Sequence, residues 1–214
     1  MPYTVLSIPK VRFSTRELVI FATLAGMMFV SKVALQFIPN IHLLGMFIAA
    51  FTLTYRAKAL LPIYVFVLLD GIYWGFSIFW APNLYIWLPL WGAFMIIGHL
   101  LQSGKSQTQR KKNSLRQFED PQENQLYKVR GKISFQGKFN TILVMFACAL
   151  HGLSFGLLYA PFQAFIFGLS FQGTLAWIIA GLPFDIIHGM GNFFSGILIL
   201  PLTSLLKKLD NSGK

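Results

Sequence analysis

The chain has 214 residues, of which 55% are hydrophobic and 12% are charged, and its formal net charge is +11. A composition this apolar excludes an ordinary water-soluble domain and predicts a protein whose solvent is lipid. The single cysteine, Cys148, excludes an internal disulfide and a metal site built from several thiolates.

Several stretches of the chain are apolar enough to cross a hydrocarbon core of about 30 Å, which takes roughly 20 residues. The six predicted spans are 17–38, 41–55, 60–78, 84–102, 141–160 and 182–206. Residues 159–178 are also apolar, but Pro161, Gly168 and Gly173 interrupt them. We interpret this segment as an extension of the fifth span followed by a loop at the membrane surface. The sequence therefore predicts an all-α integral membrane protein, with residues 1–214 forming one six-helix membrane domain.

Positive charge is restricted to alternate connections. All 18 Lys and Arg residues except Lys32 lie before span one, between spans two and three, between spans four and five, or after span six. Basic residues are retained on the cytoplasmic side during membrane insertion. The alternation predicts a multi-pass protein of the cell membrane with both termini cytoplasmic. Because the charge reports topology, we expect no binding of nucleic acid.

Span one carries small residues on one face and a lysine in its outer half. Ala22 and Gly26 are one helical turn apart, with Ala25 beside them. Small residues at this spacing let another helix approach closely, either from the same chain or from another protein. Lys32 would either extend to the outer headgroups or neutralise an acidic group of the ligand or of another span.

Spans three and four enclose an aromatic segment on the outer side. Residues 73–91 hold four of the five tryptophans, among them Trp74 and Trp87, around a connection that contains Asn83. An interfacial aromatic belt explains this pattern, and so does an aromatic pocket that opens outward. Asp70, about the middle of span three, is costly against lipid, so we expect it to face protein or a water-filled cavity.

The only long polar segment is residues 103–140, between spans four and five, where we expect a cytoplasmic loop. Its role is either that of a connector touching anionic headgroups or that of a docking surface for a cytoplasmic partner. A phosphate-binding loop is excluded, because five residues separate Gly131 from Gly137 and Phe139 stands where Ser or Thr would hold magnesium. Energy for any transport must therefore come from elsewhere.

Polar residues recur at helical spacing in span six. Asp185, His188, Asn192 and Ser195 follow at i, i+3, i+7 and i+10, which places them on one face of a helix. Asp185 alone would suit the first turn of a helix beginning near Pro183. The stripe either bonds a neighbouring helix or lines a ligand cavity. We favour the cavity, because three strong hydrogen-bonding groups exceed what one cap requires.

Two segments carry a resemblance to a known family. Span one has Ala22 and Gly26 where that family usually has two alanines, and the segment GLPFDIIHGMGNF, residues 181–193, opens the last span. With its six spans and its cytoplasmic termini, the chain resembles the substrate-binding S components of energy-coupling factor (ECF) vitamin transporters. The resemblance covers the chain except for residues 103–140.

The resemblance implies a subunit that binds a vitamin or vitamin precursor from outside and delivers it by reorienting in the bilayer. The partners implied are a transmembrane coupling subunit and two cytoplasmic ATPase subunits. The open ligand candidates are pantothenate, a pyrimidine or pyridoxine-like ring, folate and cobalamin. The surface that meets the coupling subunit would contain Ala22, Ala25 and Gly26. The predicted substrate contacts are polar and aromatic side chains of the outer half: Asp185, His188, Asn192, Lys32, Trp74, Asn83 and Trp87.

Other functions are kept as alternatives or excluded. An autonomous proton- or cation-coupled secondary carrier would use Asp70 and Asp185 as coupling sites. Such carriers often contain inverted repeats, and the two halves of this chain show no convincing similarity. We expect no enzyme activity, because the sequence has no paired acids and no nucleophile with a neighbouring base. The four histidines are scattered, so we expect neither a metal site nor a cofactor.

Overall fold

The computed structural model describes residues 13–116 and 128–212, with side chains outside 104–137. Over these ranges the regular elements are helices, and no strand is present in them. The elements are α1 (Thr15–Ala34), α2 (Leu44–Tyr55), η1 (Arg56–Ala59), α3 (Leu60–Trp74), η2 (Ala81–Leu84), α4 (Leu88–Arg116), α5 (Lys128–Leu153), α6 (Phe155–Phe167), α7 (Phe171–Ser195), η3 (Gly196–Leu198) and α8 (Ile199–Asn211).

Helical segments that are long and apolar enough to cross a membrane make up most of the described residues. The five segments are Thr15–Ala34, Leu44–Trp74, Ala81–Ser103, Lys138–Phe167 and Phe171–Asn211. Many large apolar side chains on them remain exposed, as a lipid-facing surface requires. The predicted all-α class is confirmed, and these segments support a multi-pass membrane protein.

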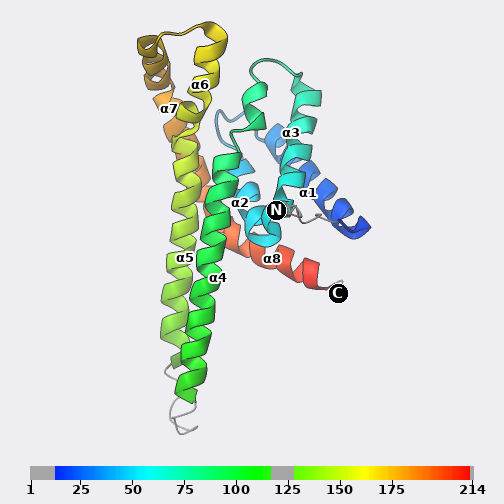
Figure 1. Ribbon diagram of the computed structural model, residues 1–214, viewed down its shortest axis with the longest axis vertical. Coiled ribbons are helices and arrows are strands. Elements are labelled where there is room, and N and C mark those ends of the chain that lie inside the picture. Colours follow the sequence, from blue (N-terminus) through cyan, green and yellow to red (C-terminus); the bar gives the residue numbers. More distant parts are fainter. Residues whose placement is uncertain (1–12, 117–127, 213–214) are drawn as a thin grey trace, which may run out of the picture.

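The segment Leu44–Trp74 turns back on itself. Figure 1 shows the chain running down through α2 and returning upward through α3. Between them, Arg56 has a φ of 57°, which takes the backbone out of the direction of α2. The 12 residues of α2 and the 15 of α3 correspond to lengths of about 18 and 22 Å. The helices expected at 41–55 and 60–78 therefore exist, and both are shorter than predicted.

Helix α2 lies at the centre of the bundle. Every residue from Leu44 to Leu53 is buried, and the helix packs against α4 and α8. Phe51 lies in one continuous core with Phe21 of α1 and Phe94 of α4. A helix that is apolar on all sides avoids water, either in lipid or among other helices, and α2 is surrounded by other helices. This position brings α2 next to the polar face of α7.

Glycines let α5 and α7 approach closely along an extensive interface. A Cβ atom added at Gly152 would lie 2.9 Å from the Cα of Gly189, and one added at Gly196 of η3, directly after α7, would lie 2.9 Å from the Cα of Met145. Close backbone approach between small residues is a main source of helix association in lipid. The packing holds the polar face of α7 against α5.

The last long helix begins earlier than predicted. Helix α6 ends at Gly168, whose φ of 60° is left-handed, and α7 begins at Phe171 after the Ser170 hydroxyl accepts a backbone N–H of its first turn. The prediction that a surface loop extends to residue 178 is wrong, because the two helices are joined by three residues. The start expected at residue 182 is also wrong, since Pro183 lies inside α7.

The polar insert at 103–140 is helical over much of its length. Helix α4 continues to Arg116 and α5 begins at Lys128, so the expected loop is wrong for residues 103–116 and 128–140. Residues 117–127 of the predicted insert lie outside the described residues. Extending an existing helix needs no new nucleus, and Lys, Arg and Gln are good helix formers. In Figure 1, α4 and α5 run side by side beyond the rest of the bundle.

An arginine ties the start of α1 to the end of α8. The Arg16 guanidinium donates hydrogen bonds to the carbonyl oxygens of Leu209 (2.6 Å) and Asp210 (3.3 Å). These carbonyls belong to the last turn of α8, whose negative dipole end favours a cation. The start of α1 and the end of α8 therefore meet at one end of the bundle.

Candidate functional site

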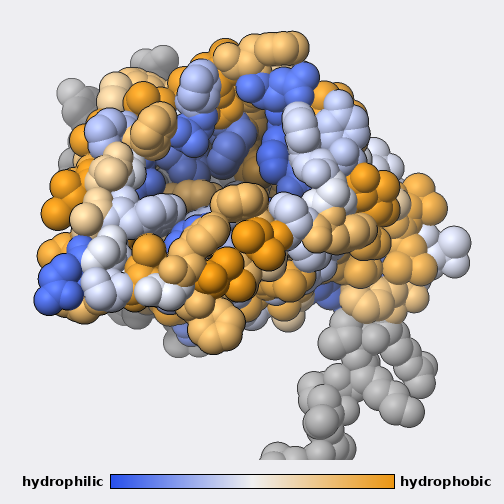
Figure 2. Space-filling model, turned by 90° about the horizontal axis from the view of Figure 1, so that it is seen from above, coloured by the Kyte–Doolittle hydropathy of each residue, from blue (hydrophilic) through white to orange (hydrophobic). Residues whose placement is uncertain are grey.

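The opposite end of the bundle, where α3 leads into η2 and α6 into α7, is hollowed. Figure 2 shows this hollow from above, with strongly hydrophilic residues inside it and hydrophobic residues around it. The described residues form two polar sites in this half of the molecule. One is an outer pocket between α1, α3 and η2, and the other is a buried cluster between α2, α4, α5 and α7.

The outer pocket has a volume of about 230 Å³. It brings together three of the predicted substrate contacts, Lys32, Trp74 and Asn83. The remaining lining residues are Asp70, Gly75, Ser77, Phe79 and Trp80. The pocket therefore combines aromatic walls with a few polar groups, as expected from the aromatic segment at 73–91.

An ion pair occupies one wall of the outer pocket. The Lys32 ammonium lies 2.5 Å from a carboxylate oxygen of Asp70, and the two side chains are 29% and 4% exposed. The expectation that Asp70 faces protein is confirmed. Of the two roles left open for Lys32, the structure shows neutralisation of an acidic group. Because the two charges cancel, the pair presents little net charge to a ligand in this pocket.

The polar stripe on α7 faces the interior of the bundle. Asp185, His188 and Asn192 are 6%, 3% and 1% exposed, whereas Phe184 and Phe194 of the same helix are exposed. The predicted one-sided placement is confirmed. The fourth residue of the stripe, Ser195, is partly buried, and the four residues do not all have the same surroundings.

Asp185 binds the start of another helix. Its two carboxylate oxygens lie 3.0 and 3.1 Å from the backbone nitrogen of Gly156, which donates to them from the first turn of α6. An acid at a helix N-terminus satisfies a free N–H and complements the dipole. The interpretation that Asp185 suits the first turn of its own helix is wrong, because α7 begins at Phe171 and Asp185 lies well inside it.

Three histidines and a tryptophan from separate segments meet beside the stripe. We define the histidine–tryptophan cluster as His42, Trp87, His151 and His188, which come from the connection before α2, the residue before α4, α5 and α7. The ring centroids lie 4.5 Å apart for His42 and His188, 6.3 Å for His42 and Trp87, and 5.8 Å for Trp87 and His151. Phe155 packs against the cluster, 4.7 Å from His188 and 6.1 Å from Trp87.

Each member of the histidine–tryptophan cluster has a buried nitrogen without a hydrogen-bond partner among the described residues. These atoms are His42 Nδ1, Trp87 Nε1, His151 Nδ1 and His188 Nε2, and the Asn192 amide adds its nitrogen and oxygen. An unpaired buried polar group costs about 1–3 kcal/mol, so folded proteins rarely keep several together. Such a concentration favours a polar solute as the partner.

The hydrogen-bond role of His151 follows from its surroundings. Its Nε2 lies 2.9 Å from the carbonyl oxygen of Ile86, which can only accept, so this nitrogen carries the proton. The Nδ1 of a neutral His151 ring is then an acceptor.

Asn192 lies in a narrow space between α2 and α5. A Cβ atom added at Gly45 would lie 3.0 Å from the Asn192 Oδ1, and one added at Gly152 would lie 2.8 Å from its Nδ2. Only glycine leaves room for the amide at these two points. The amide atoms therefore stay deep in the bundle, one helical turn from His188.

Sequence reasoning missed His42 and His151 as members of the site. Both were interpreted as members of a set of four scattered histidines. Each is the only histidine or charged residue in its stretch, between Lys32 and Arg56 for His42 and between Lys138 and Asp185 for His151. An isolated ionisable group at membrane depth is a functional candidate, which is the signal that could have found them.

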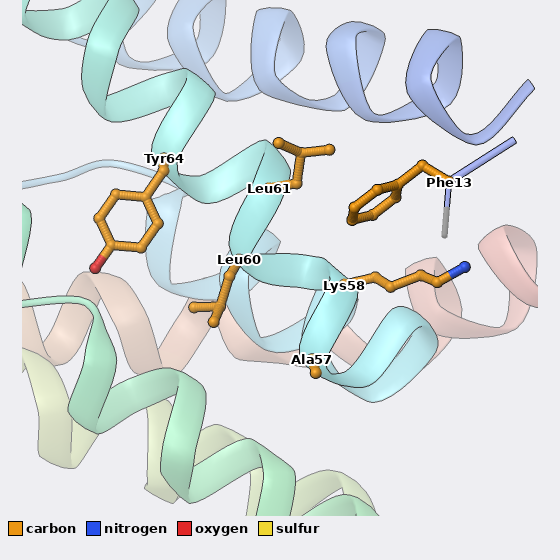
Figure 3. A pocket seen from close by; sticks show the side chains of 6 residues that line it. All are labelled: Phe13, Ala57, Lys58, Leu60, Leu61 and Tyr64. Atoms are coloured by element: carbon orange, nitrogen blue, oxygen red, sulfur yellow. The ribbon is translucent and has the colours of Figure 1, made fainter. Parts of the chain in front are cut away.

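A second pocket, of about 330 Å³, lies beside η1 and is mostly apolar. Figure 3 shows its lining residues, which are Phe13, Ala57, Lys58, Leu60, Leu61 and Tyr64. The Lys58 ammonium pairs with Glu17, and the Tyr64 hydroxyl donates to the carbonyl oxygen of Leu84 at 2.8 Å. Because these polar groups have protein partners, the pocket is a weaker candidate for a polar solute.

The small residues of α1 differ in exposure. Ala22 is exposed and Gly26 is partly exposed, with no atom within 4 Å of a Cβ added at Gly26. Ala25 is 0% exposed and lies in the core. Ala25 therefore has no surface left for another subunit, so the predicted contact face is reduced to Ala22 and Gly26.

Of the seven predicted substrate contacts, the structure divides six between two places and assigns one to a helix end. Lys32, Trp74 and Asn83 line the outer pocket. Trp87 and His188 belong to the histidine–tryptophan cluster, and Asn192 lies beside it. Asp185 binds the start of α6. The function is therefore inferred from these residues. No family model, curated protein or solved structure significantly matches this chain.

Proposed function

We propose that the chain is the high-affinity substrate-binding subunit of an ATP-driven importer of the ECF type, taking up a vitamin or vitamin precursor. The observation that carries the proposal is the set of buried polar atoms without protein partners in the histidine–tryptophan cluster and at Asn192. Ligand sites combine apolar walls with a few placed polar groups, and this cluster has both. The hollow in Figure 2 offers an approach to this half of the bundle.

In the proposed topology, α2 and α3 are two short passes, so the chain crosses the membrane six times. The contact between Arg16 and the end of α8 supports an even number of passes, because it holds both ends of the described chain at one end of the bundle. Basic residues gather in the terminal segments and in the insert, which assigns that end to the cytoplasm. The hollowed end then faces outward in the binding state.

A secondary carrier remains the alternative, with Asp70 and Asp185 as its coupling sites. Both carboxylates already have partners, Asp70 in its ion pair with Lys32 and Asp185 at the backbone N–H of Gly156. A coupling site must exchange its partner for a proton or cation in each cycle. The partners are therefore better explained by structural roles, which favours the importer subunit.

The importer proposal predicts that the chain, purified in mild detergent from cells that express it, carries an ATPase subunit with it. Gly26→Leu is expected to reduce this association at least tenfold, because a leucine would prevent close approach at the open face of α1. Binding of the small molecule by the purified chain should stay within twofold of the wild type. Quantitative mass spectrometry of the co-purified subunits and ATP-dependent uptake into vesicles provide the measurements.

Gly92→Leu is the matched control, since Gly92 of α4 also has no atom within 4 Å of an added Cβ. This variant should keep the ATPase partner. Transport that proceeds without ATP but follows a proton or sodium gradient would establish the carrier instead. If Gly26→Leu retains the ATPase subunit to the same extent as the wild type, the proposed contact face of α1 is wrong.

A further inference from the structure

We infer that the ligand is an uncharged, planar ring compound with hydrogen-bond donors and acceptors on its edge, of the pyrimidine or pyridine class, held by the histidine–tryptophan cluster. The inference rests on the proposed function and specifies the chemistry of its substrate. It selects the ring compounds among the candidates and excludes an acyclic carboxylate such as pantothenate. It also assigns the direct contacts to a set of buried nitrogens.

The unpaired atoms of the cluster form a mixed set of donors and acceptors. The Trp87 Nε1–H can only donate, whereas His151 Nδ1 accepts when its Nε2–H is bonded to Ile86. The rings of Trp87 and His151 lie 5.8 Å apart and are tilted by 30°, so this donor and acceptor come from neighbouring rings. A ring edge that carries a carbonyl or pyridine nitrogen beside an N–H or hydroxyl satisfies both. His188 Nε2 and His42 Nδ1 add two further unpaired nitrogens to the set.

Flat aromatic surfaces continue from the cluster toward the start of α7. Phe155 stacks with Tyr159 at a centroid separation of 5.9 Å, and Tyr159 stacks with Trp177 at 6.3 Å and 18°. Phe155 also lies edge-on to His188 at 4.7 Å. Aromatic faces bind planar rings by offset stacking or edge contacts at such separations. An acyclic ligand would use this surface less well.

The described residues offer an anionic ligand no unpaired lysine or arginine at the cluster. Lys32 is neutralised by Asp70, and Asp185, which accepts from the N–H of Gly156, is itself acidic. A carboxylate or phosphate moved into this site would lose its hydration without gaining a counter-charge, which is strongly unfavourable. An uncharged ring loses far less.

The test is a titration of the purified full-length chain with uracil and pyridoxine as ring probes and with pantothenate as the acyclic anionic probe. Calorimetry and ligand-induced thermal stabilisation give the affinities. At least one ring probe should bind, and Trp87→Phe should weaken it at least tenfold, because the substitution keeps the aromatic face and removes the N–H donor. Trp91→Phe is the matched control, since Trp91 donates to the carbonyl oxygen of Arg56 and should leave the affinity within twofold of wild type.

Failure of both ring probes to bind overturns the inference, whether or not pantothenate binds. Equal affinity in the wild type and Trp87→Phe overturns it as well, as does pantothenate binding that Lys32→Ala abolishes. None of these results tests whether the chain associates with an ATPase subunit. Conversely, if the chain binds a ring probe but transports without ATP, the inferred ligand class stands and the importer proposal is wrong.

Discussion

Replacing Lys32 with alanine is expected to lower the free energy of unfolding by about 3 kcal/mol, the lower end of the range for breaking a buried ion pair. The substitution leaves the Asp70 carboxylate, whose side chain is only 4% exposed, without its counter-charge in the bundle. The Lys32 side chain is 29% exposed, so water can compensate part of the loss. Thermal and denaturant unfolding of the purified chain in detergent provide the measurement.

Two variants separate the burial of charge from other effects. Lys32→Ala combined with Asp70→Ala should regain most of the lost stability, because neither charge is then left alone. Lys58→Ala breaks the pair with Glu17, where the side chains are 33% and 23% exposed, and should cost less than about 1 kcal/mol. Equal losses for Lys32→Ala and Lys58→Ala would show that the Lys32–Asp70 pair has no special energetic role.

Replacing Gly156 with alanine is expected to lower the free energy of unfolding by about 1.5 kcal/mol, because a damaged hydrogen bond to a charged group costs more than the roughly 1 kcal/mol that alanine gains over glycine inside a helix. The added Cβ would overlap Oδ2 of Asp185, which accepts from the N–H of the same glycine. Either the carboxylate moves off the start of α6 or α6 moves away from α7. Thermal unfolding of the variant in detergent measures the effect.

Gly181→Ala is the control for this prediction. Gly181 also lies inside a helix, α7, but no atom lies within 4 Å of an added Cβ. There, alanine should be neutral or stabilising by up to about 1 kcal/mol, because it reduces the freedom of the unfolded chain. A Gly156→Ala protein as stable as Gly181→Ala would mean that Asp185 does not bind the start of α6 tightly.

Much of the helical architecture could be predicted from hydropathy, because lipid leaves few alternatives to a helix. The errors lie where packing between helices outweighs a local sequence signal. Pro183 was interpreted as a helix start, yet it lies inside α7, where packing with α5 compensates for the missing backbone bond. The existence of α2 was predicted at 41–55, but its burial at the centre depends on helices far away in the sequence.

The inward face of α7 could be predicted because helical spacing alone places Asp185, His188 and Asn192 together. The groups that these residues contact could not be predicted. Asp185 finds the N–H of Gly156 only because α6 begins beside the middle of α7. The meeting of His42 with His188 likewise depends on α2 lying next to α7, which no local pattern encodes.

The two polar sites have different physical roles. In the outer pocket, Lys32 and Asp70 satisfy one another, so the pair contributes shape and stability rather than free hydrogen-bonding capacity. In the histidine–tryptophan cluster the nitrogen atoms are buried yet unpaired, and their desolvation is offset only by a partner from outside the described residues. Stability and solute binding are thus assigned to neighbouring but separate groups of residues.

Native mass spectrometry of the purified chain tests most directly whether the buried polar atoms bind a solute. The wild-type protein, isolated in mild detergent from cells that express it, should retain one small molecule per chain. The His188→Ala protein should lose that molecule, because the substitution removes an imidazole at the centre of the cluster. If the wild-type chain carries no small molecule, or His188→Ala retains it to the same extent, the cluster is structural and the proposed binding site is wrong.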